Sequence, residues 1–171
     1  PYVDGKRIGI MGGSHGGSTT LAAMYVPIEP NNPLVEAKRA GFAAAIALYP
    51  GCAPRFGAWS TTKSGNFGPV TGYSGVYQPI APLLILTGEK DDWTPAEPCR
   101  ELAERSRAAG YPVEIKIYPD AHHSFDNDRP LRYDGQRNNG NSPSGRGATT
   151  GGNSDAWADA KKQIVAFFAL H

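Results

Sequence analysis

The stretch IGIMGGSHGGSTTLAAM, from Ile8 to Met24, decides the fold. An apolar run breaks into two glycine pairs around Ser14, and an alanine-rich segment follows. This pattern predicts a strand that turns sharply into a helix, with the serine in the turn. Either the serine caps the helix, or the turn holds its hydroxyl up as a nucleophile.

Strand-like and helix-like segments alternate along the rest of the chain. The strand candidates are 7–12, 42–49, 82–87 and 113–118, and the helix candidates are 17–25, 34–40, 95–109 and 155–170. Two of the strand candidates are almost continuous apolar runs, which is typical of parallel strands covered on both faces. The order predicts the α/β class, with a mainly parallel sheet of about four strands flanked by helices.

Two features between these elements carry further expectations. In TPAE, Thr94 is expected to cap the helix that follows, with Glu97 as its capping-box partner. The segments 50–81 and 127–153 are predicted to be long irregular loops. Loops of this length are usually functional or mobile, and the composition of both segments also suits disorder.

Composition limits the kinds of protein that this chain can be. With 171 residues, 40% of them hydrophobic, and a net charge of +1, it fits one globular domain that needs neither nucleic acid nor an anionic membrane as a partner. No run approaches the roughly 20 apolar residues of a membrane span. The two cysteines, Cys52 and Cys99, are too few for a zinc pattern, and no metal or cofactor is expected.

Gly12, Ser14 and Gly16 form the pattern G-x-S-x-G directly after a strand and before a helix. In a nucleophile elbow, small neighbours allow a strained turn that lifts the serine hydroxyl clear of the sheet. The N–H of the next residue, His15, then points at the oxyanion that develops during acyl transfer. A serine nucleophile also needs a base and an orienting carboxylate, which such a fold supplies from loops after later strands.

Candidates for both groups follow in that order. EKDDWTP comes after the strand candidate at 82–87 and offers Asp91 and Asp92. DAHHSF comes after the candidate at 113–118 and offers His122 and His123. This order and the placement at strand ends favour a Ser-His-Asp triad over a capping serine.

The motifs GSHGG, LLILTGEKDDWTPAEPC and YPDAHHSFD resemble the dienelactone hydrolase family of α/β-hydrolases, from about Lys6 to the C-terminus. The resemblance implies Ser14 as the nucleophile and Asp91 as the acid, by its G-x-x-D-x-x-x-P spacing. It implies His123 as the base, because a small residue and a phenylalanine follow it. The namesake enzymes use a cysteine nucleophile, so the serine implies a general esterase that acts on a small ester or lactone.

Members of that family carry several strands before the elbow strand. Residues 1–171 are therefore expected to be a single domain that is a fragment, or one chain of a larger domain, and to represent the C-terminal part of an α/β-hydrolase fold. The elbow strand would have an open apolar edge. A complementary chain could supply the missing strands and the second oxyanion donor, whose loss typically lowers the rate about 100- to 1,000-fold.

Trp93 and Phe125 are candidates for lining a substrate pocket, because they lie next to the expected acid and base. Two alternatives to an esterase remain open. One is an oligopeptidase-like α/β-hydrolase that cleaves peptides, and the other is a catalytically incompetent fragment or interaction module.

Cys52 follows the strand candidate at 42–49, and Cys99 lies early in the helix after the candidate at 82–87. If these strands are neighbours in a parallel sheet, both cysteines lie above the same edge, within the distance that a disulfide allows. A pair of buried free thiols is the alternative. A bridge would indicate a secreted or periplasmic protein, because such bonds seldom persist in a reducing cytosol.

Overall fold

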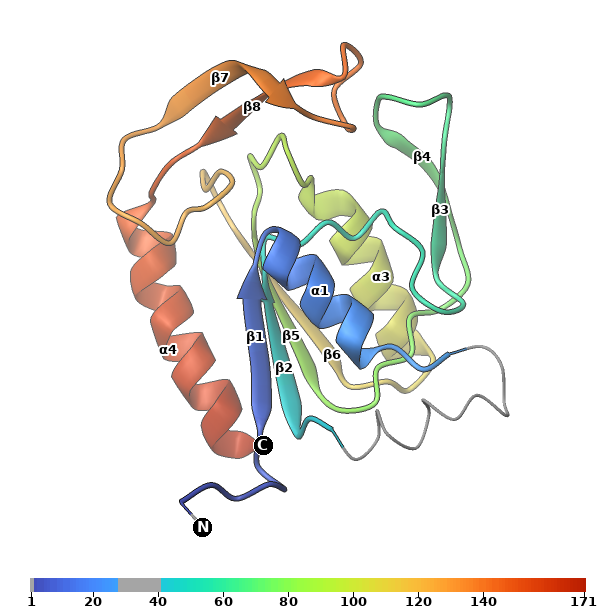
Figure 1. Ribbon diagram of the computed structural model, residues 1–171, viewed down its shortest axis with the longest axis vertical. Coiled ribbons are helices and arrows are strands. Elements are labelled where there is room, and N and C mark those ends of the chain that lie inside the picture. The colour runs from blue at the N-terminus through green and yellow to red at the C-terminus, as the bar shows by residue number, and fades with distance from the viewer. Residues whose placement is uncertain (1, 28–40) are drawn as a thin grey trace.

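A four-stranded parallel sheet forms the centre of the computed structural model, which describes residues 2–27 and 41–171. The strands are β1 (Gly9–Gly13), β2 (Ala44–Leu48), β5 (Leu83–Gly88) and β6 (Val113–Tyr118). They lie in the order β1-β2-β5-β6, and all neighbours run parallel. The carboxyl ends of all four strands therefore meet at one edge of the sheet (Figure 1).

Helices cover both faces of this sheet (Figure 1). The helices are α1 (His15–Met24), α3 (Ala96–Ala108) and α4 (Ser154–Leu170). Alternate side chains of β2 and β5 enter two separate cores, as the period of a strand requires. The core with α1 and α3 contains Ala45, Ala47, Leu83 and Ile85. The core with α4 contains Ala44, Ile46, Leu84 and Leu86. The expected α/β class and four-stranded parallel sheet are confirmed.

Most of the expected elements are present within a few residues of their predicted bounds, but the helix expected at 34–40 lies outside the described residues. The capping box is wrong. Helix α3 begins one residue later than expected, Pro95 stands at its N-cap, and no side chain caps it. The hydroxyl of Thr94 instead bonds to groups of the candidate site, which are described below.

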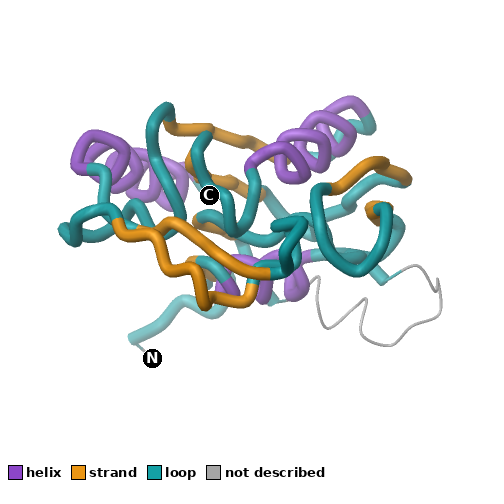
Figure 2. Tube along the Cα trace, turned by 90° about the horizontal axis from the view of Figure 1, so that it is seen from above, coloured by secondary structure: helices purple, strands orange, loops and turns teal. Residues whose placement is uncertain are grey.

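Both long segments that were expected to be irregular or disordered contain antiparallel hairpins. β3 (Ser60–Lys63) pairs with β4 (Val70–Ser74), and β7 (Arg132–Asn138) pairs with β8 (Arg146–Thr150). β3 and β7 are mostly polar and at most partly buried, so they lack the apolar alternation that identifies a strand in a sequence. Seen from the carboxyl end of the sheet, the β7–β8 hairpin extends across it (Figure 2).

Cys52 and Cys99 form the expected disulfide, with Cα atoms 5.1 Å apart. The geometric condition for it is met, because β2 and β5 are neighbours in the sheet. The bridge joins the segment after β2 to the first turn of α3, and both cysteines are buried in the core that α1 and α3 cover.

The outer edge of β1 pairs with no other strand in the part of the chain that the structure describes. Ile8, just before this strand, and Met11, in its middle, are 39% and 52% exposed. The elbow strand thus has the open, partly apolar edge that the sequence predicts. No helix among residues 2–27 and 41–171 is both long and apolar enough to cross a membrane.

Candidate active site

Ser14 occupies the turn between β1 and α1. Its backbone, with φ 55° and ψ −119°, is in a conformation that residues other than glycine seldom adopt. A Cβ atom on Gly12 would collide with the carbonyl group of Gly16, so the turn requires glycine at position 12. The side chain of Ser14 makes no capping bond to α1. The reading of this serine as a helix cap is therefore wrong, and its strained backbone fits a residue held for another purpose.

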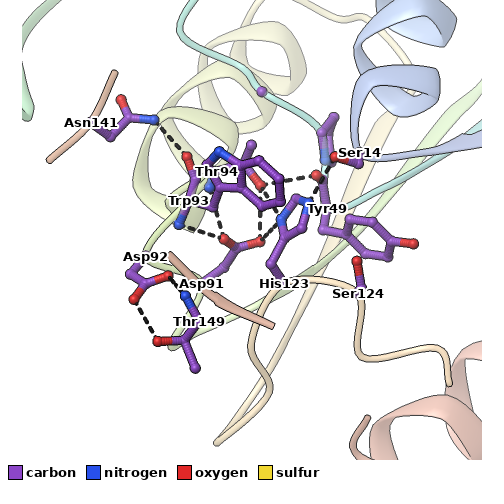
Figure 3. Close-up of polar contacts among 12 residues, drawn as sticks. Ser14, Tyr49, Asp91, Asp92, Trp93, Thr94, His123, Ser124, Asn141 and Thr149 are labelled. Carbon is purple, nitrogen blue, oxygen red and sulfur yellow. Dashed lines mark hydrogen bonds and ion pairs between the residues drawn. The ribbon is translucent and has the colours of Figure 1, made fainter. Parts of the chain in front are cut away.

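The structure brings together the three residues that the sequence assigns to a triad (Figure 3). The hydroxyl of Ser14 lies 2.7 Å from Nε2 of His123, and Nδ1 of His123 lies 2.8 Å from Oδ2 of Asp91. These residues come from the loops after β1, β6 and β5, at the shared carboxyl edge. This geometry suits a histidine that donates from Nδ1 to the carboxylate and accepts the serine proton at Nε2.

The carboxylate of Asp91 is buried, and three donors surround it. The backbone N–H groups of Trp93 and Thr94 donate to Oδ1 at 2.9 and 2.8 Å, and the hydroxyl of Thr94 lies 2.9 Å from Oδ2. Such bonds offset the cost of burying a charge and fix the direction of the carboxylate. The same hydroxyl is 3.0 Å from both Nδ1 of His123 and the carbonyl oxygen of Tyr49. Sequence reasoning assigned Thr94 to a cap and missed this contact.

Among the described residues, the other members of the two tandem pairs, Asp92 and His122, form no hydrogen bond with Ser14. The carboxylate of Asp92 accepts from the N–H and the hydroxyl of Thr149, both at 2.8 Å, so it faces β8 (Figure 3). Nδ1 of His122 is buried and has no hydrogen-bond partner among the described residues. The spacing that selects Asp91 and His123 thus agrees with the observed geometry.

Aromatic rings enclose His123. The Tyr49 ring meets it edge-on at 4.8 Å, and the Trp93 ring lies 4.7 Å away, both measured between ring centres. Burial, together with the hydrogen bond that Tyr49 donates to Asp126, raises the pKa of Tyr49 above its usual range, so the phenol stays neutral. Trp93 therefore lies at the site, as the sequence suggests.

Phe125 does not line an open pocket. Its side chain is fully buried and packs against Tyr49 and Tyr118, with ring centres 5.6 and 5.2 Å apart. Phe125 was expected to line a substrate pocket because it lies two residues after His123. The chain turns inward at this point and places the ring in the core beneath α4.

One candidate oxyanion donor lies beside Ser14. His15 is the first residue of α1, where backbone N–H groups have no carbonyl partner within the helix and the helix dipole favours negative charge. The imidazole of His15 is on the exposed side of the helix, so its backbone is the relevant group.

A cleft of about 550 Å³ lies between the residues that follow His123 and the β7–β8 hairpin, and none of Ser14, Asp91 and His123 lines it. Its lining includes Ser124, which follows His123 in the chain, Thr150, whose backbone forms a β-bridge with His123, and three arginines. Among these, Arg137 pairs with Asp134 at 3.6 Å. No cluster of side chains that could hold a metal ion occurs among residues 2–27 and 41–171.

A family model for the prolyl oligopeptidase family matches residues 1–138. The chain belongs to the prolyl oligopeptidase family. A search of curated protein sequences finds no match to this family member.

Solved structures with an α/β-hydrolase fold resemble it. A Klebsiella pneumoniae protein named as a dienelactone hydrolase is 24% identical, with a TM-score of 0.57 over 98% of this chain and 54% of its own. Thermogutta terrifontis esterase 2 is 16% identical in its butyrate-bound form, with a TM-score of 0.57 over 98% of this chain and 57% of its own. The tabun-phosphoramylated form of that esterase is 17% identical, with a TM-score of 0.54 over 96% of this chain and 56% of its own.

These similarities establish the fold of this family member and agree with the dienelactone hydrolase resemblance of its motifs. The chain spans little more than half the length of the solved proteins that it matches, between 54% and 57%. It therefore corresponds to one part of their fold.

Proposed function

We propose that this chain carries the catalytic residues of a serine hydrolase that cleaves carboxylic esters or lactones through an acyl-enzyme. The observation that carries the proposal is the continuous line of hydrogen bonds from Asp91 through His123 to Ser14. It starts from a buried carboxylate and ends at a hydroxyl on a strained elbow. Few structural roles call for both features in one place.

In the proposed mechanism, the oxygen of Ser14 attacks the ester carbonyl while Nε2 of His123 accepts the serine proton. The N–H of His15 stabilises the oxyanion, and the imidazolium then protonates the departing alcohol. Asp91 holds the imidazole in its tautomer and stabilises its positive charge. A water molecule, deprotonated by His123, hydrolyses the acyl-enzyme and restores the serine.

Peptide hydrolysis is the second candidate, and the match to the prolyl oligopeptidase family favours it. The same three residues would serve, but an amine is a poorer leaving group than an alcohol and depends more on protonation by His123. Parallel assays with short acyl aryl esters and with peptide anilides separate the two activities.

The proposal includes a complementary segment or chain beside β1. The open edge of that strand and the half-length match to solved hydrolases support it. Such a segment would provide the second oxyanion donor. Export to the periplasm or the extracellular space is also proposed, and the buried disulfide supports it.

Labelling with a fluorophosphonate probe tests the proposed function, because the probe reacts with a serine that a base activates and not with a serine that is merely exposed to solvent. We expect labelling of the wild-type chain, loss of labelling and of ester turnover in Ser14→Ala, and no change in Ser144→Ala, which alters an exposed loop serine. An unlabelled wild-type chain that is folded by circular dichroism would favour the non-enzymatic alternative.

A further inference from the structure

The β7–β8 hairpin has no part in the proposed chemistry, yet it is fastened to the acid loop, which we define as residues 91–94. Asp92 of this loop accepts both bonds from Thr149 of β8. Neither hydrophobic core of the described residues includes a residue of β7 or β8. The hairpin thus contributes little to the main cores and much to the surroundings of the acid.

Asn139, the residue after β7, makes the central connection. Its side chain is 2% exposed, and its amide nitrogen donates to the carbonyl oxygens of Asp92 and Gly147 at 2.8 and 2.7 Å. Its amide oxygen accepts from the N–H of Asn141 at 2.9 Å. One buried amide therefore ties the acid loop to both strands' ends, and its removal would leave two carbonyl groups without these donors.

Trp93 is held by the hairpin at three points. Its carbonyl oxygen accepts from the side chain of Asn141 at 2.8 Å, and its indole N–H donates to the carbonyl oxygen of Asn138 at 3.0 Å. The guanidinium of Arg137 lies 4.7 Å from the centre of the ring. Since the same ring lies 4.7 Å from the imidazole of His123, the indole stands between the hairpin and the base (Figure 3).

We propose that the β7–β8 hairpin determines which esters the site accepts, because it fixes the indole of Trp93 beside His123. Trp93 is the specificity-determining residue, and Asn139 is a positioning residue that acts through it. This inference rests on the proposed function. One hydrogen bond and the guanidinium of Arg137 fix the indole, and the bond from Asn141 fixes the backbone of Trp93. The ring therefore cannot swing aside, and it limits the size of the ester group next to the base.

The variant Asn139→Asp tests the inference, since it keeps the shape of the side chain and removes both donated bonds. The matched control is Asn138→Ala, which changes an exposed side chain and leaves the carbonyl group that receives the indole bond. We would measure kcat and KM for p-nitrophenyl acetate and p-nitrophenyl octanoate. The ratio of kcat/KM, octanoate over acetate, should rise about tenfold in Asn139→Asp and stay unchanged in the control.

Trp93→Ala should raise the same ratio, and the double variant should raise it no further, because both changes act through one side chain. A general loss of folding would instead lower kcat/KM for both substrates by the same factor and leave their ratio unchanged. An unchanged ratio with normal labelling of Ser14 would overturn this inference alone. An unlabelled wild-type Ser14 would overturn the proposed function and, with it, the claim about specificity.

Discussion

Replacing both cysteines, as Cys52→Ala with Cys99→Ala, should lower the free energy of unfolding by about 4 kcal/mol. The bridge links residues 47 positions apart. A crosslink of that span restrains the unfolded chain, and its loss returns the conformational entropy of a long loop. Both cysteines are buried, and alanine fits in the space of each without adding a polar group.

Urea unfolding followed by tryptophan fluorescence measures this change. For a chain of 171 residues, the loss corresponds to a fall in Tm of roughly 8–16 °C. The unreduced wild-type chain should show no free thiol after denaturation, and the reduced wild-type chain should unfold like the double variant. A loss below about 1 kcal/mol would refute the entropic reasoning, and two reactive thiols would refute the bridge and the proposed export.

Three further pairs of substitutions test the site. Asp91→Asn should lower kcat by about 10⁴-fold, and Asp92→Asn by less than about tenfold because an amide oxygen still accepts from β8; ester kinetics would show equal losses if the assignment is wrong. In urea titrations, Gly12→Ala should lower the free energy of unfolding by about 1–3 kcal/mol. Gly16→Ala has open space around it and should raise that free energy by up to about 1 kcal/mol. Similar values for both variants would contradict the elbow geometry. Thr94→Val should lower kcat about tenfold at constant KM and Thr94→Ser should restore it, so a valine variant with full turnover would exclude a role for the hydroxyl.

The parallel sheet and the three candidate catalytic residues could be predicted because their signals are local. β2 and β5 are continuous apolar runs, and glycine-rich or acidic turns follow β1 and β5 directly. In a parallel sheet, segments that follow strands meet at one edge whatever the order of the strands. The order and spacing of Ser14, Asp91 and His123 therefore carried information about distances in space.

The hairpins could not be predicted because contacts with distant residues stabilise them. The amino group of Lys63 donates to the side chain of Asn141, 78 positions along the chain, and Asp92 binds Thr149, 57 positions away. The role of Thr94 was missed for a similar reason. Its hydroxyl can bond either to the free N–H groups at a helix end or to a carboxylate. Which of the two bonds forms depends on where the carboxylate lies in space, and a local sequence does not show this.

The open edge of β1 links enzyme chemistry to solution behaviour. β1 leads directly into Ser14, and its outer edge, which has no partner strand within residues 2–27 and 41–171, can accept a strand from another molecule. Two chains joined there about a two-fold axis would pair antiparallel, so the start of each β1 would lie beside the elbow of its partner and obstruct the approach to Ser14. Specific activity should then fall as the protein is concentrated and recover on dilution, because self-association of the isolated chain would inhibit it.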